Sequence, residues 1–261
     1  MATIANDGTR VLDGDAAERR FFLILAIIMT LGIVGGFSLN LGMGRSTFAV
    51  PPIFHVHAFV FFAWVALFLA QNVLIARNKP ALHRRLGWIA VGWVPLMVVA
   101  GTWLAFTVLQ RTGGPFFFAK NAFLFSNVAH LLTFAGLTLV GLKQRRYTGW
   151  HRRFMLTGMA ILSGPGFGRL VPLPLLIPYA WHVMLGVVLL FPVAGMIRDK
   201  LRHGRVHPAW FWAIGALLVA QVIADIAAHS AWGIGLTETL TAGTPGAERP
   251  MQAFLPPGFT L

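Results

Sequence analysis

Cysteine is absent from the 261-residue chain, and charged residues are few. Without cysteine the chain cannot form disulfide bonds, thiolate nucleophiles, cysteine-ligated zinc sites or iron–sulfur clusters. Charged residues make up 11% of the sequence and hydrophobic residues 57%, whereas a soluble domain usually carries about 25% charged residues. This composition excludes a disordered chain, a nucleic-acid-binding domain and an ordinary cytosolic enzyme.

Acidic residues are especially scarce: 8 aspartates and glutamates stand against 21 lysines and arginines, for a formal net charge of +13. A charge of this size can indicate a nucleic-acid partner. Here, however, the basic residues lie in short stretches between long apolar blocks. We therefore expect no nucleic-acid partner, and we attribute the positive charge to the topology of a membrane protein.

Seven apolar segments are each long enough to cross a hydrocarbon core, which takes about 20 helical residues. We therefore predict an all-α fold, a polytopic transmembrane helix bundle of about seven spans. The fifth span is the least regular, because three glycines and Pro165 fall within 164–168 and weaken its helical hydrogen bonding. The predicted spans are 21–42, 53–76, 86–109, 121–142, 154–174, 176–197 and 209–233.

Basic residues are distributed unevenly about these spans: sixteen of the 21 fall on one side of the membrane and four on the other. Because cytoplasmic loops carry the excess of lysine and arginine, we predict an N-terminus inside and a C-terminus outside, in a bacterial inner membrane. The partner of the basic loops is then a lipid bilayer with anionic headgroups on its cytoplasmic side. The chain divides into a cytoplasmic polar leader, a seven-helix transmembrane domain and an external tail, at 1–20, 21–235 and 236–261.

Histidines recur at corresponding places along the chain, which predicts one leading helix followed by three hairpins. In each hairpin one histidine lies in the first span and another opens the second, in ALHRRLGW, GWHRRFML and, more loosely, VHPAW. We interpret the two HRR triplets as anchors of topology, with contact to lipid headgroups or a cofactor as the alternative. The pairs are His57 and His83, His130 and His151, and His182 and His207.

Ionisable residues inside a membrane are costly, so each is a functional hypothesis. The predicted spans place six of them in the outer third of the bundle. Neutral imidazoles are ligands for haem iron and for copper, zinc or non-haem iron. We expect a cofactor site from His57, His130, His182 and Arg169, and metal ligation by His57, His130, His182, Asp225 and His229.

The supporting roles in this site follow from residue type and spacing. Asp225 and His229 lie four residues apart in a stripe that also includes Gln221 and Trp232, so Asp225 can orient His229. Arg169 can pair with a haem propionate, a carboxylate substrate or Asp225. The alternatives are structural: single histidines that hydrogen-bond a neighbouring helix, and an Arg169–Asp225 ion pair.

Several of these residues form a sequence pattern that resembles a large bacterial family of multi-pass membrane proteins known only as a domain of unknown function. The pattern is a histidine, a glutamine, HRxxG, HRxxM and a downstream arginine, and it covers about 55–172. The resemblance implies a membrane protein and assigns no reaction. The matching positions are His57, Gln71, His83, Arg84, Gly87, His151, Arg152, Met155 and Arg169.

The sequence is also distantly similar to the membrane b-type cytochromes that reduce iron or carry ascorbate electrons. Those proteins bind two haems through histidine pairs one leaflet apart on shared helices. Here Gln71 and Gln144 stand 14 residues after His57 and His130. The resemblance therefore implies one haem or one metal in the outer third, and no two-haem wire.

Three functions fit these observations. The leading hypothesis is a haem b or transition-metal (Cu, Fe, Zn) redox protein, a candidate membrane oxidoreductase with a redox partner or a homo-oligomeric assembly. The second is a transporter of a proton-coupled or anionic solute, which the interrupted fifth span favours. The third is a non-enzymatic accessory or sensor subunit whose polar residues only specify packing.

Overall fold

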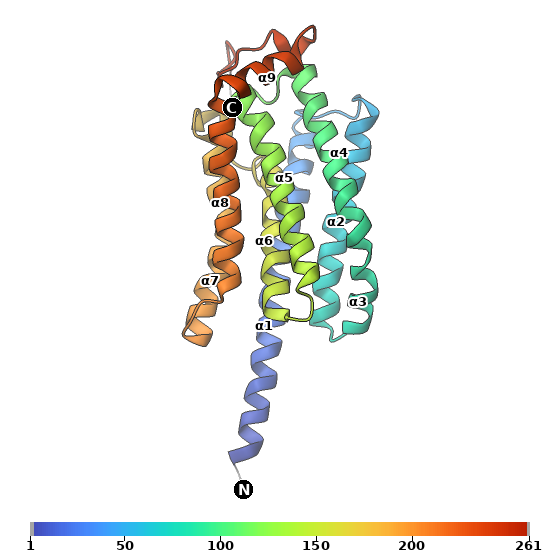
Figure 1. Cartoon of the computed structure of the whole chain (residues 1–261). Coiled ribbons are helices and arrows are strands. Elements are labelled where there is room, and N and C mark those ends of the chain that lie inside the picture. Colours follow the sequence, from blue (N-terminus) through green and yellow to red (C-terminus); the bar gives the residue numbers. More distant parts are fainter. Residues whose placement is uncertain (1–2, 260–261) are drawn as a thin grey trace.

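A computed structural model of the protein describes residues 3–259, with side chains from Ala16 onward. This part of the chain is all-α and contains no strand (Figure 1). Its α-helices are α1 (Thr3–Gly42), α2 (Pro52–Ala76), α3 (Pro80–Gly87), α4 (Ile89–Thr112), α5 (Lys120–Lys143), α6 (Thr148–Phe167), α7 (Ala180–His203), α8 (Pro208–His229) and α9 (Ala231–Thr241). Two short 3₁₀ helices are η1 (Leu173–Leu176) and η2 (Pro245–Ala247).

Six of these helices are long and apolar enough to cross a membrane, namely α1 from Ala16, α2, α4, α5, α7 and α8. This confirms the predicted all-α architecture of a multi-pass membrane protein. The predicted fifth span is the exception. Its helix α6 begins with the polar turn TGWHRR and ends at Phe167, before the predicted boundary at 174.

Helix α6 nevertheless lies in the middle of the bundle, in contact with α1, α5, α7 and α8 (Figure 1). Small residues allow this close packing. A Cβ atom added to Gly166 would lie 2.5 Å from the Cα atom of Ile33 on α1. Only glycine therefore fits where α1 and α6 cross, and the glycines of the fifth span have a packing role.

The chain between α6 and α7 is irregular apart from η1, and α7 begins at Ala180, not at the predicted residue 176. Pro172, Pro174 and Pro178 lie in this segment. Proline lacks the N–H group that a continuing helix needs, so the helical ladder cannot run through the segment. The irregular segment joins the α6 and α7 ends that lie near α9.

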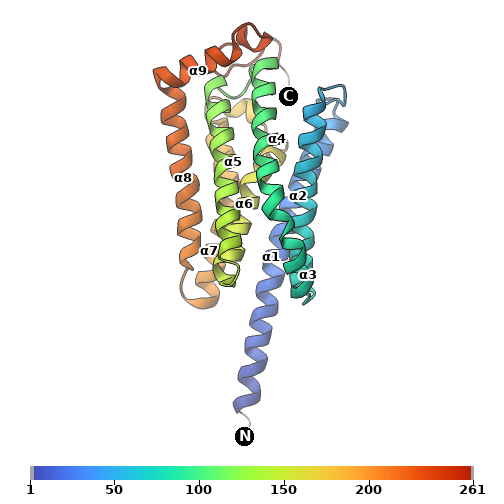
Figure 2. The ribbon, with the colours of Figure 1, turned by 45° about the vertical axis from the view of Figure 1, so that its right-hand side comes forward.

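The predicted seventh span, 209–233, is divided between α8 and α9. The break occurs at Ser230, whose hydroxyl accepts a hydrogen bond from the Gly233 backbone N–H at 3.0 Å and so caps α9. Gly233 lies directly against the Ala227 carbonyl, where a Cβ atom would not fit. Helix α9 consequently turns across the end of the bundle (Figure 2).

The segment after α9 covers the ends of α4 and α5. The ammonium group of buried Lys120 donates hydrogen bonds to the Gly246 and Arg249 carbonyls, both at 3.1 Å. The Arg249 guanidinium in turn donates to the carbonyls of Gly113 and Phe118. The predicted domain boundary between 235 and 236 falls inside α9, and the described part of the predicted tail packs on the bundle.

The two termini lie at opposite ends of the bundle (Figure 1). We call these the α9 end, where α9 covers the helices, and the α3 end, where α3 lies and the N-terminal half of α1 projects beyond the other helices. The predicted leader, from residue 3 on, is the first part of that continuous helix. The assignment of the two ends to the inside and outside of a cell stays a prediction.

Candidate functional site

Two of the predicted site residues contact each other between neighbouring helices. His182 on α7 places its Nε2 atom 3.1 Å from Oδ2 of Asp225 on α8. The other carboxylate oxygen of Asp225 accepts a hydrogen bond from the Gln221 side chain at 2.8 Å. The His182 side chain is 53% exposed, so the pair lies at the surface between α7 and α8, where solvent or a ligand can reach it.

The buried side of this pair is a hydrogen-bond network that reaches α5. The Gln221 amide accepts from the Trp181 indole N–H at 2.9 Å and donates to the Ser126 hydroxyl at 3.1 Å. The His130 ring lies beside Trp181, with 5.4 Å between ring centroids. The Nε2 atom of His130 is buried and has no hydrogen-bond partner among the described residues, which leaves one ring nitrogen available for a ligand.

His229 does not join this network through its side chain. Its Nδ1 atom lies 2.9 Å from the backbone carbonyl of Asp225, one turn earlier on the same helix. Trp232 does not extend the predicted stripe either, because it follows the break at Ser230 and packs against Phe125 from α9. The expected orientation of His229 by the Asp225 carboxylate is therefore not present.

A second group of predicted residues lies between α1, α2 and the segment after α6. The His57 ring stacks on Phe61 with 4.0 Å between ring centroids, and Arg169 lies near enough to act on His57 electrostatically. The Arg169 guanidinium carbon lies 3.8 Å from the centroid of the Phe37 ring. The arginine thus rests on an aromatic face with an imidazole nearby.

Arg169 has no carboxylate partner among the described side chains. Its NH1 group donates to the Pro165 carbonyl at 2.6 Å, and its Nε atom is buried without a partner. The Arg169–Asp225 ion pair considered from the sequence is wrong, because Asp225 binds His182 and Gln221 instead. The guanidinium keeps donors for an anion.

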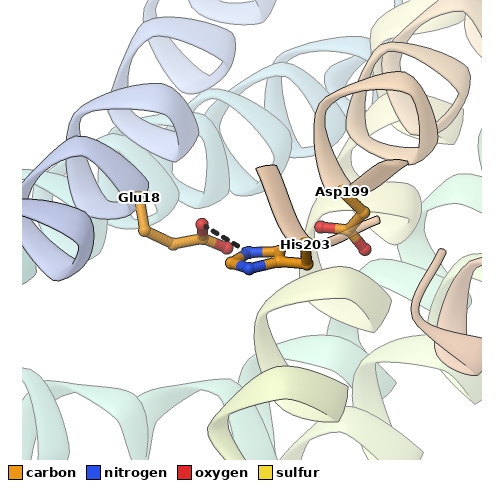
Figure 3. A group of neighbouring side chains, drawn as sticks. All are labelled: Glu18, Asp199 and His203. Carbon is orange, nitrogen blue, oxygen red and sulfur yellow. Dashed lines mark ion pairs between the residues drawn. The ribbon is translucent and has the colours of Figure 1, made fainter. Parts of the chain in front are cut away.

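A described contact joins His182 to Asp225, and Arg169 acts on His57 only electrostatically; no described contact joins these two groups to each other. Within the described part of the chain, three potential metal ligands come within 4.8 Å of one another at a different place, formed by Glu18, Asp199 and His203. Figure 3 shows this group, with Glu18 reaching from α1 toward two residues of α7. The joint metal site of the five sequence-predicted ligands stays a prediction.

The carboxylates of this group are already engaged by arginines. Asp199 accepts from Arg153 through Nε at 3.0 Å and NH2 at 2.5 Å, and from the Trp210 indole at 2.9 Å. Glu18 lies 2.5 Å from NH1 of Arg198 and 2.8 Å from NH2 of Arg152. By position the group could hold a metal ion, but three guanidiniums on two carboxylates repel a cation. Its chief role is therefore to fasten α1, α6 and α7 together.

Sequence reasoning missed this group because Glu18 falls in the predicted leader and Asp199 in a predicted loop. The available signal was the i, i+4 spacing of Asp199 and His203, together with the rarity of acidic residues in the chain. A cavity of about 620 Å³ opens beside the group. It is lined by Arg152, Arg153, Asp199, His203, Arg205, Val206, His207 and Pro208.

Comparison of the chain with protein-family models, with curated proteins and with solved structures finds no match. The resemblance to the bacterial family with the H, Q, HRxxG and HRxxM pattern therefore stays a prediction. The function has to be argued from the geometry of the side chains.

Proposed function

We propose that this multi-pass membrane protein binds an anionic solute, one bearing a carboxylate or phosphate group, at Arg169 and His57. The observation that carries the proposal is Arg169, a half-buried cation without a carboxylate partner among the described residues. Withdrawing a charge from water without pairing it is unfavourable. An anionic ligand would supply the missing counter-charge.

Arg169 has the donors for such a ligand. A guanidinium carries five N–H groups in a planar fork that matches carboxylate and phosphate oxygens, and one group is engaged by the Pro165 carbonyl. The contact with Phe37 stabilises the cation from one face only. His57, stacked on Phe61, adds a second hydrogen-bonding group within electrostatic range of Arg169.

The surroundings favour a carrier among the proteins that bind anions. Transporters often place their solute where a membrane helix is interrupted, and Arg169 lies just after α6 ends, in the irregular segment before α7. The accessible His182–Asp225 pair adds a second polar group between α7 and α8. Together these features support the transport of an anionic solute.

The test is binding of defined anions to the purified full chain in detergent. We expect phosphate or a small carboxylate from a panel of acetate, succinate and citrate to raise the melting temperature, because a ligand at about 100 times its Kd stabilises by about 2.7 kcal/mol. Arg169→Gln should abolish this rise. Arg111→Gln is the matched control, since Arg111 also lies over a phenylalanine ring, that of Phe54, at the α9 end.

Anions that stabilise the wild-type protein and the Arg169→Gln variant equally would contradict the proposal. So would a wild-type protein that no member of the panel stabilises and that carries no acidic ligand from its source.

A second candidate function is the binding of haem b or a transition metal (Cu, Fe, Zn) by His130, with His57 and His182 as further ligands. The buried Nε2 atom of His130, which has no partner in the described chain, favours it. Haem would also supply a negative counter-charge for Arg169, because the haem propionates are carboxylates. When bound, haem or the metal would supply one-electron redox chemistry, and the chain would hold it through these imidazoles.

A visible spectrum and metal analysis of the purified protein test this candidate. We expect His130→Ala to lose the bound haem or metal. His55→Ala, at an exposed histidine on α2, should retain it. A folded His130→Ala protein with undiminished cofactor would exclude His130 as a ligand.

A further inference from the structure

The histidines of the two HRR triplets meet at the α3 end of the bundle. His83 lies on α3 and His151 on the first turn of α6, and their ring centroids are 6.0 Å apart with the planes at 85°. Neither residue belongs to the anion site at Arg169 or to the His182–Asp225 pair. The sequence repeat thus brings two imidazoles together from separate hairpins.

One imidazole of the pair is engaged by a backbone carbonyl, and the other has a buried nitrogen without a partner. Nδ1 of His151 lies 2.8 Å from the Gly141 carbonyl oxygen. A carbonyl only accepts hydrogen bonds, so this nitrogen carries the proton and Nε2 keeps its lone pair. The Nδ1 atom of His83 is buried without a partner among the described residues, so in the tautomer protonated at Nε2 it also offers a lone pair.

A third acceptor lies beside this pair. The side-chain oxygen Oε1 of Gln71, on α2, is buried and has no hydrogen-bond partner in the described chain. Buried polar atoms are nearly always satisfied, so two orphaned acceptors in one place indicate a missing ligand. Met155 lies four residues after His151 on α6 and contributes a thioether near Gly141, at 3.2 Å from the position of an added Cβ atom.

The geometry points to a transition-metal site at the α3 end, with Nδ1 of His83 and Nε2 of His151 as ligands and the Gln71 oxygen as a third. In metal sites a ligating histidine commonly donates its other N–H to a backbone carbonyl, the arrangement that the His151 ring has here. An ion about 2.0 Å from each ligating nitrogen is accommodated between rings whose centroids are 6.0 Å apart.

The ligand chemistry selects the class of ion. Imidazole nitrogens suit copper, zinc and iron, and copper binds such ligands most tightly among the divalent first-row ions. The ion can come from two sources, a free copper or zinc ion or the iron of a haem. The hard ions magnesium and calcium are excluded because they require mostly oxygen ligands.

The sequence comparison with two-haem cytochromes considered only histidines 14 residues apart on a shared helix, whereas this site takes its imidazoles from α3 and α6. Gln71 stands 14 residues after His57 on α2, about 21 Å along the helix at about 1.5 Å per residue. His83 and His151 bring two imidazoles to the level of Gln71, from α3 and α6. The bundle therefore carries separate histidine groups at its two ends.

Metal analysis of the full chain purified in detergent, followed by titration of the chelator-treated protein with Cu²⁺ and with Zn²⁺, tests the proposal. We expect about one ion per chain. We also expect His83→Ala and His151→Ala each to weaken metal binding at least tenfold, because changes at residues of a metal site typically cost about that much affinity. A Soret band that both variants abolish identifies haem iron as the source. Copper or zinc bound without such a band identifies a free ion.

Three matched variants separate this site from the others. His203→Ala removes the histidine of the Glu18 group, and Arg169→Gln removes the proposed anion site. His130→Ala removes the ligand of the second candidate function. All three variants should leave metal binding at the α3 end unchanged. If an alanine variant does not fold, His83→Gln and His151→Gln, checked by circular dichroism, take its place. A wild-type protein that binds neither metal nor haem, or folded His83 and His151 variants with wild-type affinity, would overturn the proposal.

Discussion

At the scale of single residues, several of the chain's few carboxylates are held by basic side chains, whereas Arg169 has no carboxylate partner among the described side chains. Arg153 is 2% exposed and holds Asp199 through two N–H groups. His182 holds Asp225. Truncating one partner of a buried pair such as Arg153–Asp199 leaves an uncompensated buried charge and destabilises the fold. The main role of the acidic residues near the α3 end is therefore to stabilise the structure.

His207, which lines the cavity beside the Glu18 group, makes stability depend on pH. Burial is the main effect that lowers the pKa of its imidazole. The positive charges of Arg153, Arg152 and Arg205 lower this pKa further, and the negative charge of Asp199 only partly opposes them. The unfolded chain therefore binds this proton more readily than the folded one. Stability is full above about pH 6.5 and falls as the pH drops below that value.

We predict that His207→Asn reduces the loss of melting temperature between pH 7.5 and pH 5.5. Asparagine keeps an acceptor for the Ala209 backbone N–H, which His207 caps at 3.1 Å, but it does not titrate. The measurement is thermal unfolding in detergent at both pH values. An identical pH-dependent loss in the variant would show that His207 does not contribute.

At the scale of helices, apolar length alone could predict six of the spans, because these helices face lipid over much of their surface. It could not place the ends of α6. That helix is surrounded by four others, so its buried residues can include Arg153, Thr157 and Ser163. Its hydropathy therefore understates its burial, and the prolines that follow it decide where it ends.

The crossing of α1 and α6 gives a prediction at this scale. Gly166→Ala would push a methyl group into the backbone of Ile33, and overpacking of this kind costs about 1–3 kcal/mol. Gly186→Ala on α7 is the matched control, because nothing lies within 4 Å of an added Cβ atom there. Alanine should be neutral or stabilising at Gly186, since it is the better helix former by about 1 kcal/mol.

Thermal or denaturant unfolding of both variants measures the difference. If Gly166→Ala proved as stable as Gly186→Ala, the close crossing of α1 and α6 would not be needed for the fold.

At the scale of the whole molecule, the site could be predicted only in part. Depth in the membrane grouped His182 with Asp225, which lie 3.1 Å apart, but depth does not say which helices are neighbours. His130 lies beside Trp181, next to this pair, whereas His57 lies beside Phe61, and a single site shared by all of them stays a prediction. The meeting of His83 with His151 depends on how α3 and α6 pack, which the repeat in the sequence suggested only by its symmetry.

Topology provides the prediction for the whole chain. With sixteen basic residues assigned to one side, reporter fusions after residues 80, 147 and 203 should read inside the cell, and a fusion after residue 250 should read outside. The structure places the segment after α9 at one end of the bundle and the turns after α2, α5 and α7 at the other (Figure 2). An inside reading at residue 250 would refute the predicted orientation.

The cap at the α9 end has a consequence for the order of assembly. Lys120 finds its carbonyl partners on Gly246 and Arg249, residues that a ribosome adds more than a hundred positions later. While the chain is being made, α4 and α5 can enter the membrane, but the ammonium group of Lys120 still has to be solvated by water or headgroups. Closure of this end over α4 and α5 therefore has to wait until the segment after α9 has been synthesised.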